Sequence, residues 1–88
     1  MIVKCQQIAE GPGPSEVTVS ILTVEGIREE VVLSRRMLQE GRMNVGAALS
    51  HEEGRYLIEL PREAASGLWR IWVPESEVVT DRVLQPAE

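Results

Sequence analysis

The side chains with the strongest intrinsic chemistry in this sequence are one cysteine, Cys5, and one histidine, His51. A cysteine nucleophile needs a base within hydrogen-bond reach, a group that orients this base, and an oxyanion site. Cys5 stands in an apolar, alternating segment, where cysteine usually serves as a small hydrophobic residue. His51 stands in a polar turn, HEEG, and no spacing requires the two to meet. We therefore expect a protein that is not an enzyme and has no catalytic residues.

Metal and cofactor sites have equally little support in the sequence. A structural zinc site needs four Cys or His ligands at workable spacing, whereas the main cluster here is His51 with Glu52 and Glu53. The stretch GPGPSE at 11–16 matches only part of a phosphate-binding GxGxxG loop. Glu16 replaces the third glycine, and the prolines remove amides that would bind phosphate. We expect no metal and no cofactor.

The most informative segment for binding is Leu68–Val73, LWRIWV. Side chains alternate between the two faces of a strand, so Trp69 falls on one face with two aliphatic residues, and Arg70 and Trp72 fall on the other. A small core takes a tryptophan from only one face. Because Trp and Arg are enriched in binding hot spots, we expect a surface patch of Trp72 and Arg70, which Tyr56 on a neighbouring strand would extend. The alternative is a strand buried on both sides.

Composition limits the class of the protein and its partners. The chain has 88 residues, one cysteine and a net charge of −5, with 14 acidic and 9 basic residues. A single cysteine forms no internal disulfide, which suits a reducing cytosol, and no apolar run approaches the length of a membrane span. The basic residues are interleaved with acidic ones rather than clustered as nucleic-acid binding requires. We expect a cytoplasmic protein whose partner is another protein or a second copy, and neither nucleic acid nor a membrane.

Alternating apolar residues and turn signals predict short strands throughout the chain. The expected strands lie at 1–9, 16–24, 28–34, 42–49, 55–60 and 68–73, and a short apolar pair follows at 78–79. Residues 34–41 fit either a short helix or a twisted loop between strands. No internal repeat is visible in the sequence. We expect one β domain over residues 1–80 and a frayed tail over residues 81–88.

These elements predict a mostly β fold, either a small antiparallel barrel of five or six strands or a sandwich, with at most one short helix. We favour the barrel, because closing a sheet removes its exposed edge strands. The core must be aliphatic, since the chain has no Phe, two Trp and one Tyr.

The stretch Leu68–Val79, LWRIWVPESEVV, resembles the end of an SH3-like barrel. In that family a strand runs into a proline, a one-turn 3₁₀ helix follows, and a short apolar strand closes the barrel. Pro74, residues 75–77 and Val78–Val79 take these places, so the resemblance implies an SH3-like fold. Peptide-binding SH3 domains also have adjacent tryptophans and an aromatic-rich segment near the first strand. This chain has neither, so we do not extend proline-rich peptide binding to it.

Two functions are open at this point. The first is a non-catalytic module for protein–protein interaction or self-association that presents Trp72 and Arg70. The second is a regulatory domain that binds a small molecule or nucleotide in a cleft near residues 11–14 and the doublet Arg35–Arg36. The burial of Trp72 tests the first function, because a Trp72 fully buried among aliphatic side chains would exclude the patch.

Overall fold

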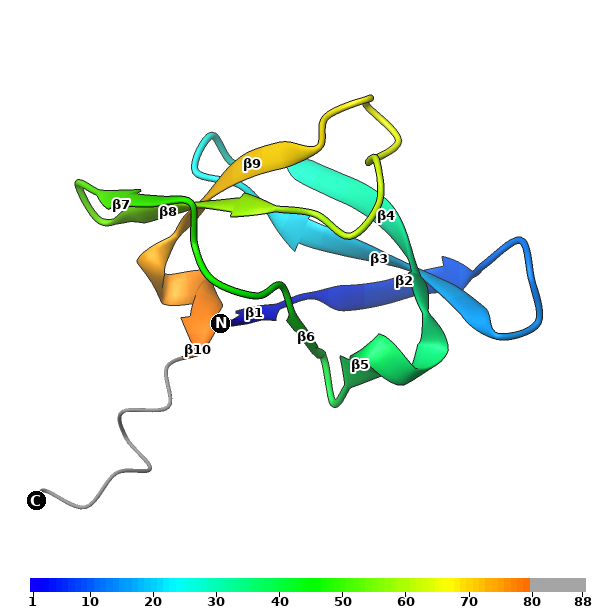
Figure 1. The fold of residues 1–88 in the computed structure, drawn as a ribbon. Coiled ribbons are helices and arrows are strands. Elements are labelled where there is room, and N and C mark those ends of the chain that lie inside the picture. Colours follow the sequence, from blue (N-terminus) through cyan, green and yellow to red (C-terminus); the bar gives the residue numbers. More distant parts are fainter. Residues whose placement is uncertain (80–88) are drawn as a thin grey trace, which may run out of the picture.

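The computed structural model describes residues 1–79 and shows a mostly β domain (Figure 1). Its strands pair antiparallel in three sheets, and two 3₁₀ turns, η1 (Arg35–Met37) and η2 (Glu75–Glu77), interrupt them. The strands are β1 (Ile2–Lys4), β2 (Gln6–Glu10), β3 (Glu16–Leu22), β4 (Arg28–Ser34), β5 (Leu38–Gln39), β6 (Arg42–Asn44), β7 (Ser50–Glu52), β8 (Arg55–Glu59), β9 (Arg70–Pro74) and β10 (Val78–Val79).

The strands form three sheets. The central sheet has the strand order β10-β1-β6-β5, the N-terminal sheet has the order β2-β3-β4, and the C-terminal sheet has the order β7-β8-β9. The expectation of a small, mostly β, antiparallel domain is confirmed. The strands within residues 1–79 do not close into a barrel, because they are short and the chain changes sheets between them. The expected tail at 81–88 lies outside the described residues.

Two expected strands are shorter than their alternating patterns indicate. The strand expected at 1–9 breaks at Cys5, whose N–H donates to the Gly41 carbonyl at 2.8 Å, and there the chain passes from the central sheet into the N-terminal sheet. The strand expected at 42–49 ends at Asn44, because Gly46 has a φ of 79° and its N–H donates to Asn44 Oδ1. Residue 34 ends β4, and residues 35–41 form η1, β5 and a tight turn, so the segment is neither one continuous helix nor a loop without regular structure.

The succession of strand, 3₁₀ turn and short strand occurs twice. It is present at the end of the chain as β9, η2 and β10, where the resemblance to SH3-like barrels implies it, and again as β4, η1 and β5. In both copies the residue after the 3₁₀ turn, Leu38 or Val78, donates its N–H to the first residue of the turn, Arg35 or Glu75. The motif is therefore a recurrent local structure of this fold, and a relationship to SH3-like barrels stays a prediction.

The repetition extends to the whole chain, although the sequence shows no repeat. Strands β1 to β5 and strands β6 to β10 follow the same plan, and their hairpins β2–β3 and β7–β8 extend toward opposite ends of the molecule (Figure 1). At the centre, Val3 of β1 lies opposite Met43 of β6. Val78 of β10 pairs with Val3 as Leu38 of β5 pairs with Met43. These registers define an approximate two-fold axis between Val3 and Met43.

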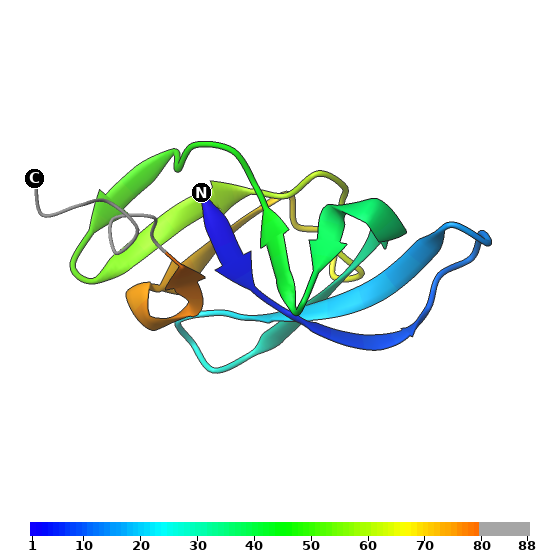
Figure 2. The same ribbon diagram turned by 90° about the horizontal axis from the view of Figure 1, so that it is seen from below.

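Backbone hydrogen bonds obey the same two-fold relation. The bond from Cys5 to the Gly41 carbonyl has its counterpart in the bond from Val45 N–H to the Met1 carbonyl, at 2.8 and 2.9 Å. Figure 2, which views the molecule from below, shows β1 and β6 crossing in front of the other strands. The two halves therefore meet along this strand pair.

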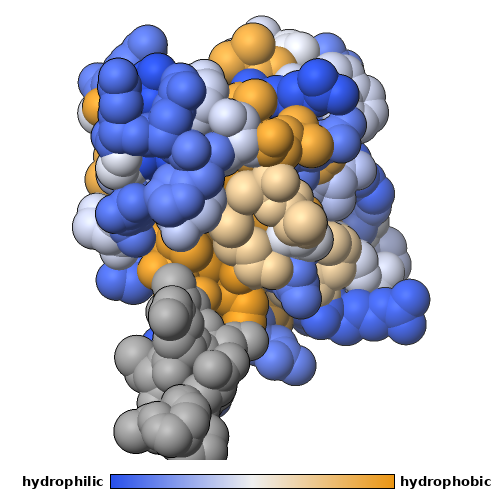
Figure 3. Space-filling model, turned by 60° about the vertical axis from the view of Figure 1, so that its left-hand side comes forward, coloured by the Kyte–Doolittle hydropathy of each residue, from blue (hydrophilic) through white to orange (hydrophobic). Residues whose placement is uncertain are grey.

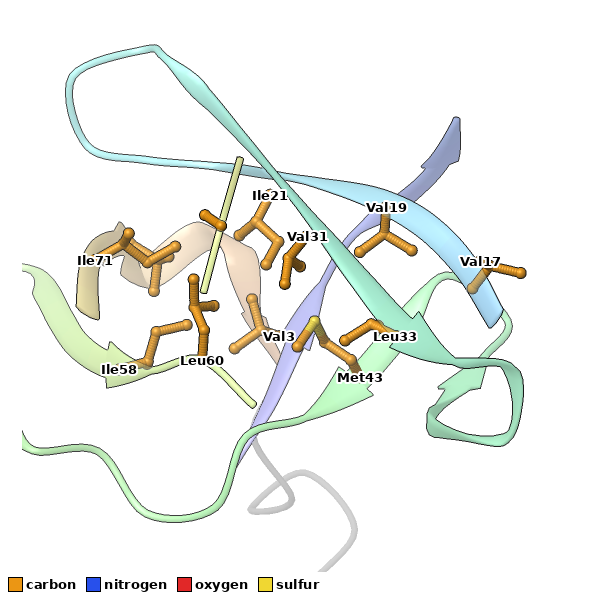
Figure 4. Close-up of a cluster of buried hydrophobic side chains, with 12 residues drawn as sticks. Val3, Val17, Val19, Ile21, Val31, Leu33, Met43, Ile58, Leu60 and Ile71 are labelled. Atoms are coloured by element: carbon orange, nitrogen blue, oxygen red, sulfur yellow. The ribbon is translucent and has the colours of Figure 1, made fainter. Parts of the chain in front are cut away.

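The core is built from equivalent positions of the two halves (Figure 4). Val19 corresponds to Ile58 and Leu33 to Val73, and each is at most 1% exposed. The buried apolar side chains are Val3, Val17, Val19, Ile21, Val31, Leu33, Met43, Ile58, Leu60, Ala64, Ile71 and Val73. Because each half supplies about half of these side chains, neither half has a complete core alone.

The two-fold relation predicts that a circular permutant will fold. Val79 lies opposite Ile2 as Gln39 lies opposite Arg42, and a two-residue turn, Glu40–Gly41 with φ of 53° and 77°, joins the second pair. A chain that begins with Met and Arg42, continues from Val79 through Asn–Gly into Ile2, and ends at Gln39 recreates that type I′ turn. We expect the β circular dichroism of the natural chain and a Tm within about 10 °C of it.

The control permutant opens the chain inside β3, between Val19 and Ser20. It divides the longest hairpin, so we expect it not to fold. If the Asn–Gly permutant were as unfolded as this control, the proposed correspondence between the two halves would be wrong.

Candidate interaction surface

The outer face of the C-terminal sheet, turned away from the core, carries the predicted patch. On β8 and β9, Leu57 lies opposite Trp72 and Glu59 lies opposite Arg70, so these side chains share one face. Ile58 and Ile71 point the other way and are buried. We call this outer face the Trp72 face. It comprises Arg55, Leu57, Glu59, Arg70, Trp72 and Pro74.

Arg55 holds the ring of Trp72 from one side. Its guanidinium carbon lies 4.2 Å from the ring centroid, a cation–π stack. Its Nε is buried and has no hydrogen-bond partner within residues 1–79, and its Nη2 lies 3.4 Å from Glu52 Oε2. Trp72 itself is partly exposed. The condition that would have excluded the patch, full burial of Trp72, is not met.

A hollow of about 160 Å³ lies beside Trp72. The turn between β3 and β4 forms one wall, because Val24 N–H donates to the Trp72 carbonyl at 3.0 Å. Ile27 on this turn and Leu68 before β9 also line the hollow and are 55% and 48% exposed. Exposed apolar side chains gathered inside a polar rim mark interaction sites. Arg70 also lines the hollow, and its Nη2 lies 4.0 Å from Glu59 Oε2.

The two-fold relation supplies an internal comparison for this face. In the N-terminal sheet, Val32 occupies the position of Trp72 and Glu30 occupies the position of Arg70. The arginine and leucine of β8 likewise correspond to a glutamate and a threonine of β3. The same backbone plan is therefore satisfied by small or acidic side chains. The tryptophan and arginines of the Trp72 face are not required by the fold.

Two aromatic residues lie elsewhere than the strand alternation predicted. Tyr56 is on the inner face, where it packs against the core and stacks on His51 with ring centroids 4.0 Å apart. It does not extend the Trp72 face. Trp69 was expected to share the buried face of Ile71, but it is 51% exposed. The reason is that β9 begins only at Arg70, so Trp69 lies in the preceding bend.

Cys5 and His51 have separate surroundings. His51 Nε2 lies 2.6 Å from Glu75 Oε2, and the His51 ring contacts Tyr56. Cys5 sits between β1 and β2, and burial raises the pKa of its thiol to about 11. In the described part of the chain no hydrogen bond joins the two side chains, so the structure does not bring them together as a nucleophile and base.

The region near residues 11–14 and Arg35–Arg36, where a nucleotide cleft was expected, does not offer the free backbone amides of a phosphate-binding loop. The Gly11 and Gly13 amides are taken by Glu16, which accepts them with its backbone carbonyl and its carboxylate. Arg35 is paired with the Glu10 carboxylate. A shallow hollow of about 440 Å³ remains, lined by Ser15, Ser34, Arg35 and Arg36. Of its two arginines, only Arg36 is without a carboxylate partner in residues 1–79.

A second apolar surface lies at the end where β1 begins. Ile2 pairs with Val79, and Val45 N–H donates to Met1, which brings partly exposed apolar side chains together. Figure 3 shows apolar atoms exposed in the middle of this side of the molecule, with hydrophilic atoms around them. Among residues 1–79, the one arginine stacked on an aromatic ring is Arg55 on Trp72, so the described part of this surface lacks the distinctive feature of the Trp72 face.

Comparisons of this chain with protein-family models, curated proteins and solved structures find no match. Within residues 1–79, no helix is long and apolar enough to cross a membrane. In the same range, no group of three or more His, Cys, Asp or Glu side chains is arranged to hold a metal ion. The function is therefore inferred from the surface chemistry described above.

The reactivity of Cys5 should follow its raised pKa. Because burial moves the pKa from 9.0 to about 11, little thiolate is present at pH 8, and thiolate is the reactive form. We expect dithionitrobenzoate to react at least about ten-fold more slowly with the native protein than with the urea-unfolded chain. The raised pKa also favours the protonated native state, so stability should fall as the pH rises from 9 toward 11. Equal rates in both states would contradict the burial of Cys5.

Proposed function

We propose that this protein is a non-catalytic interaction module that binds another protein through the Trp72 face. The observation that supports this most directly is the comparison between the two halves. Trp72 and Arg70 stand where Val32 and Glu30 serve the same backbone plan. Side chains that a fold does not need, and that belong to the types most enriched in hot spots, favour a role in binding.

The physical properties of the face fit a protein partner. Trp72 is partly exposed beside Ile27 and Leu68, so a partner that covers them removes apolar surface from water, at about 25 cal/mol per Å². The stack with Arg55 already orders the indole ring, which lowers the entropy cost of binding. Arg55 and Arg70 each lie near a glutamate. Affinity should therefore depend on apolar contact more than on charge.

The proposal also covers self-association, the cellular location and the relationship to SH3-like barrels. A second copy of the chain is one possible protein partner, in which case the module self-associates. The free Cys5 suits the reducing cytoplasm, where we place the protein. The resemblance of Leu68–Val79 to SH3-like barrels is part of this proposal as well.

The test compares Trp72→Ala with Trp69→Ala. Trp69 is the matched control, because it is exposed and close in sequence but does not line the hollow beside Trp72. Pull-down from cells of the source organism should retain the same identified protein with the natural chain and with Trp69→Ala, and lose it with Trp72→Ala. With the purified partner, Trp72→Ala should cost about 2 kcal/mol, roughly 30-fold in Kd.

Three further measurements complete this test. Circular dichroism should show that both variants are folded, and sedimentation at several concentrations reports whether the partner is a second copy. Raising the salt concentration should change the Kd little, since the charges of the face are already paired. Binding that is equally strong in Trp72→Ala and in the natural chain would refute the proposal.

A further inference from the structure

Three basic side chains of this acidic protein have neither an ion-pair partner nor a hydrogen-bond partner among residues 1–79. Five of the basic residues in 1–79 lie near a carboxylate or hydroxyl group, and these are Arg28, Arg35, Arg55, Arg62 and Arg70. The other three are Lys4, Arg36 and Arg42, which form neither an ion pair nor a hydrogen bond with any described residue. All three belong to the region of β1, η1 and β6.

These cations lie on or beside the outer face of the central sheet. Lys4 lies opposite Arg42, and this face is opposite to the one that carries the buried Val3 and Met43. Figure 2 shows β1 and β6 in front of the other strands, so no other described strand covers the outer face. Like charges on directly opposed residues destabilise a sheet. The pairing of Lys4 with Arg42 therefore does not serve stability.

A hollow of about 380 Å³ opens between η1 and β6. Arg36 and Arg42 line it together with apolar Ile2, Met37 and Met43. The amide side chains of Gln39 and Asn44 and the carboxylate of Glu40 also line it. The Glu40 carboxylate lies within ion-pair distance of neither arginine. The volume falls in the range of small-molecule sites, which combine an apolar lining with a few polar groups.

The two-fold relation again shows that these cations are not required by the fold. Arg42 corresponds to Ile2 and Lys4 corresponds to Asn44 in the paired strands. Likewise, η2 has a serine where η1 has Arg36. The same backbone is thus formed without charge at the equivalent positions, and the positive cluster occurs on one side of the axis only.

We propose that this hollow binds a small organic anion with an apolar body. The head group, a carboxylate or a phosphate, lies between Arg36 and Arg42, since guanidinium groups bind either group through paired hydrogen bonds. The apolar body lies on the partly exposed side chains of Ile2 and Met37. This site is separate from the Trp72 face, so it stands or falls independently of the proposed protein partner.

The experiment is a titration of the full ¹⁵N-labelled chain, followed by amide chemical shifts. Octanoate and octyl phosphate are the probes, and their comparison separates a carboxylate from a phosphate head group. We expect saturable shifts in β1, η1, β5 and β6 with at least one of them. Octanol, which has the tail without charge, and inorganic phosphate, which has the charge without a tail, should each bind at least ten-fold more weakly. Octanol that binds as tightly as the anions, or shifts confined to other strands, would overturn the proposal.

Substitutions then assign the site. The double variant Arg36→Gln with Arg42→Gln should weaken binding at least ten-fold, and its Tm should not fall, because the repulsion between Lys4 and Arg42 is removed. Arg70→Gln on the Trp72 face is the matched control and should bind like the natural chain. An unchanged affinity in the double variant, or an equal loss in Arg70→Gln, would contradict the proposed site.

Discussion

The antiparallel pairing of β1 with β6 is the contact on which the rest of the structure depends. It is only three residue pairs long, with Val3 opposite Met43 at its centre, yet it joins two halves that each lack a complete core. Each half presents the apolar face of its hairpins to this pair and to the other half. The chain has a single cysteine and no Phe, so burial of aliphatic side chains and backbone hydrogen bonds, such as that from Val24 N–H to the Trp72 carbonyl, hold the halves together. This arrangement determines the three sheets and their open edges. It also leaves two separate outer faces, the Trp72 face and the outer face of the central sheet.

Alternation in the sequence predicts the inner strands well, because burial of one face leaves a period of two. Val17, Val19 and Ile21 are all fully buried as that pattern requires. It fails where the chain leaves a sheet, as at Cys5, because a change of partner strand leaves no mark in hydrophobicity. The internal repeat is invisible for a related reason. Equivalent core positions are filled by different residues, such as Val3 and Met43, since the core constrains volume and apolarity rather than identity.

The candidate site is predictable in part. Trp72 and Arg70 fall on one exposed face because their spacing along β9 fixes it, and strand alternation alone suffices for that. Arg55 is missed, since its stack on Trp72 depends on the register between β8 and β9. Tyr56 was predicted on the wrong face, because the prediction did not know the register between β8 and β9. Its neighbour Arg55 lies on the Trp72 face instead. The unpaired Lys4 and Arg42 likewise become a cluster only when distant segments pair, so an interleaved distribution of charge along the chain conceals a local positive surface.

The position of β1 between β6 and β10 has a consequence for how the chain reaches this structure. The hairpins β3–β4 and β8–β9 close short loops, whereas β1 finds its second neighbour only when β10 has left the ribosome. Until then an edge of β1 is free to accept a strand from another chain. Because the two halves are equivalent, the first half of one molecule fits the second half of another. We therefore expect domain swapping through an opened turn at Glu40–Gly41 to be the main misassembly of this fold, and size-exclusion chromatography would show it as a species of twice the mass.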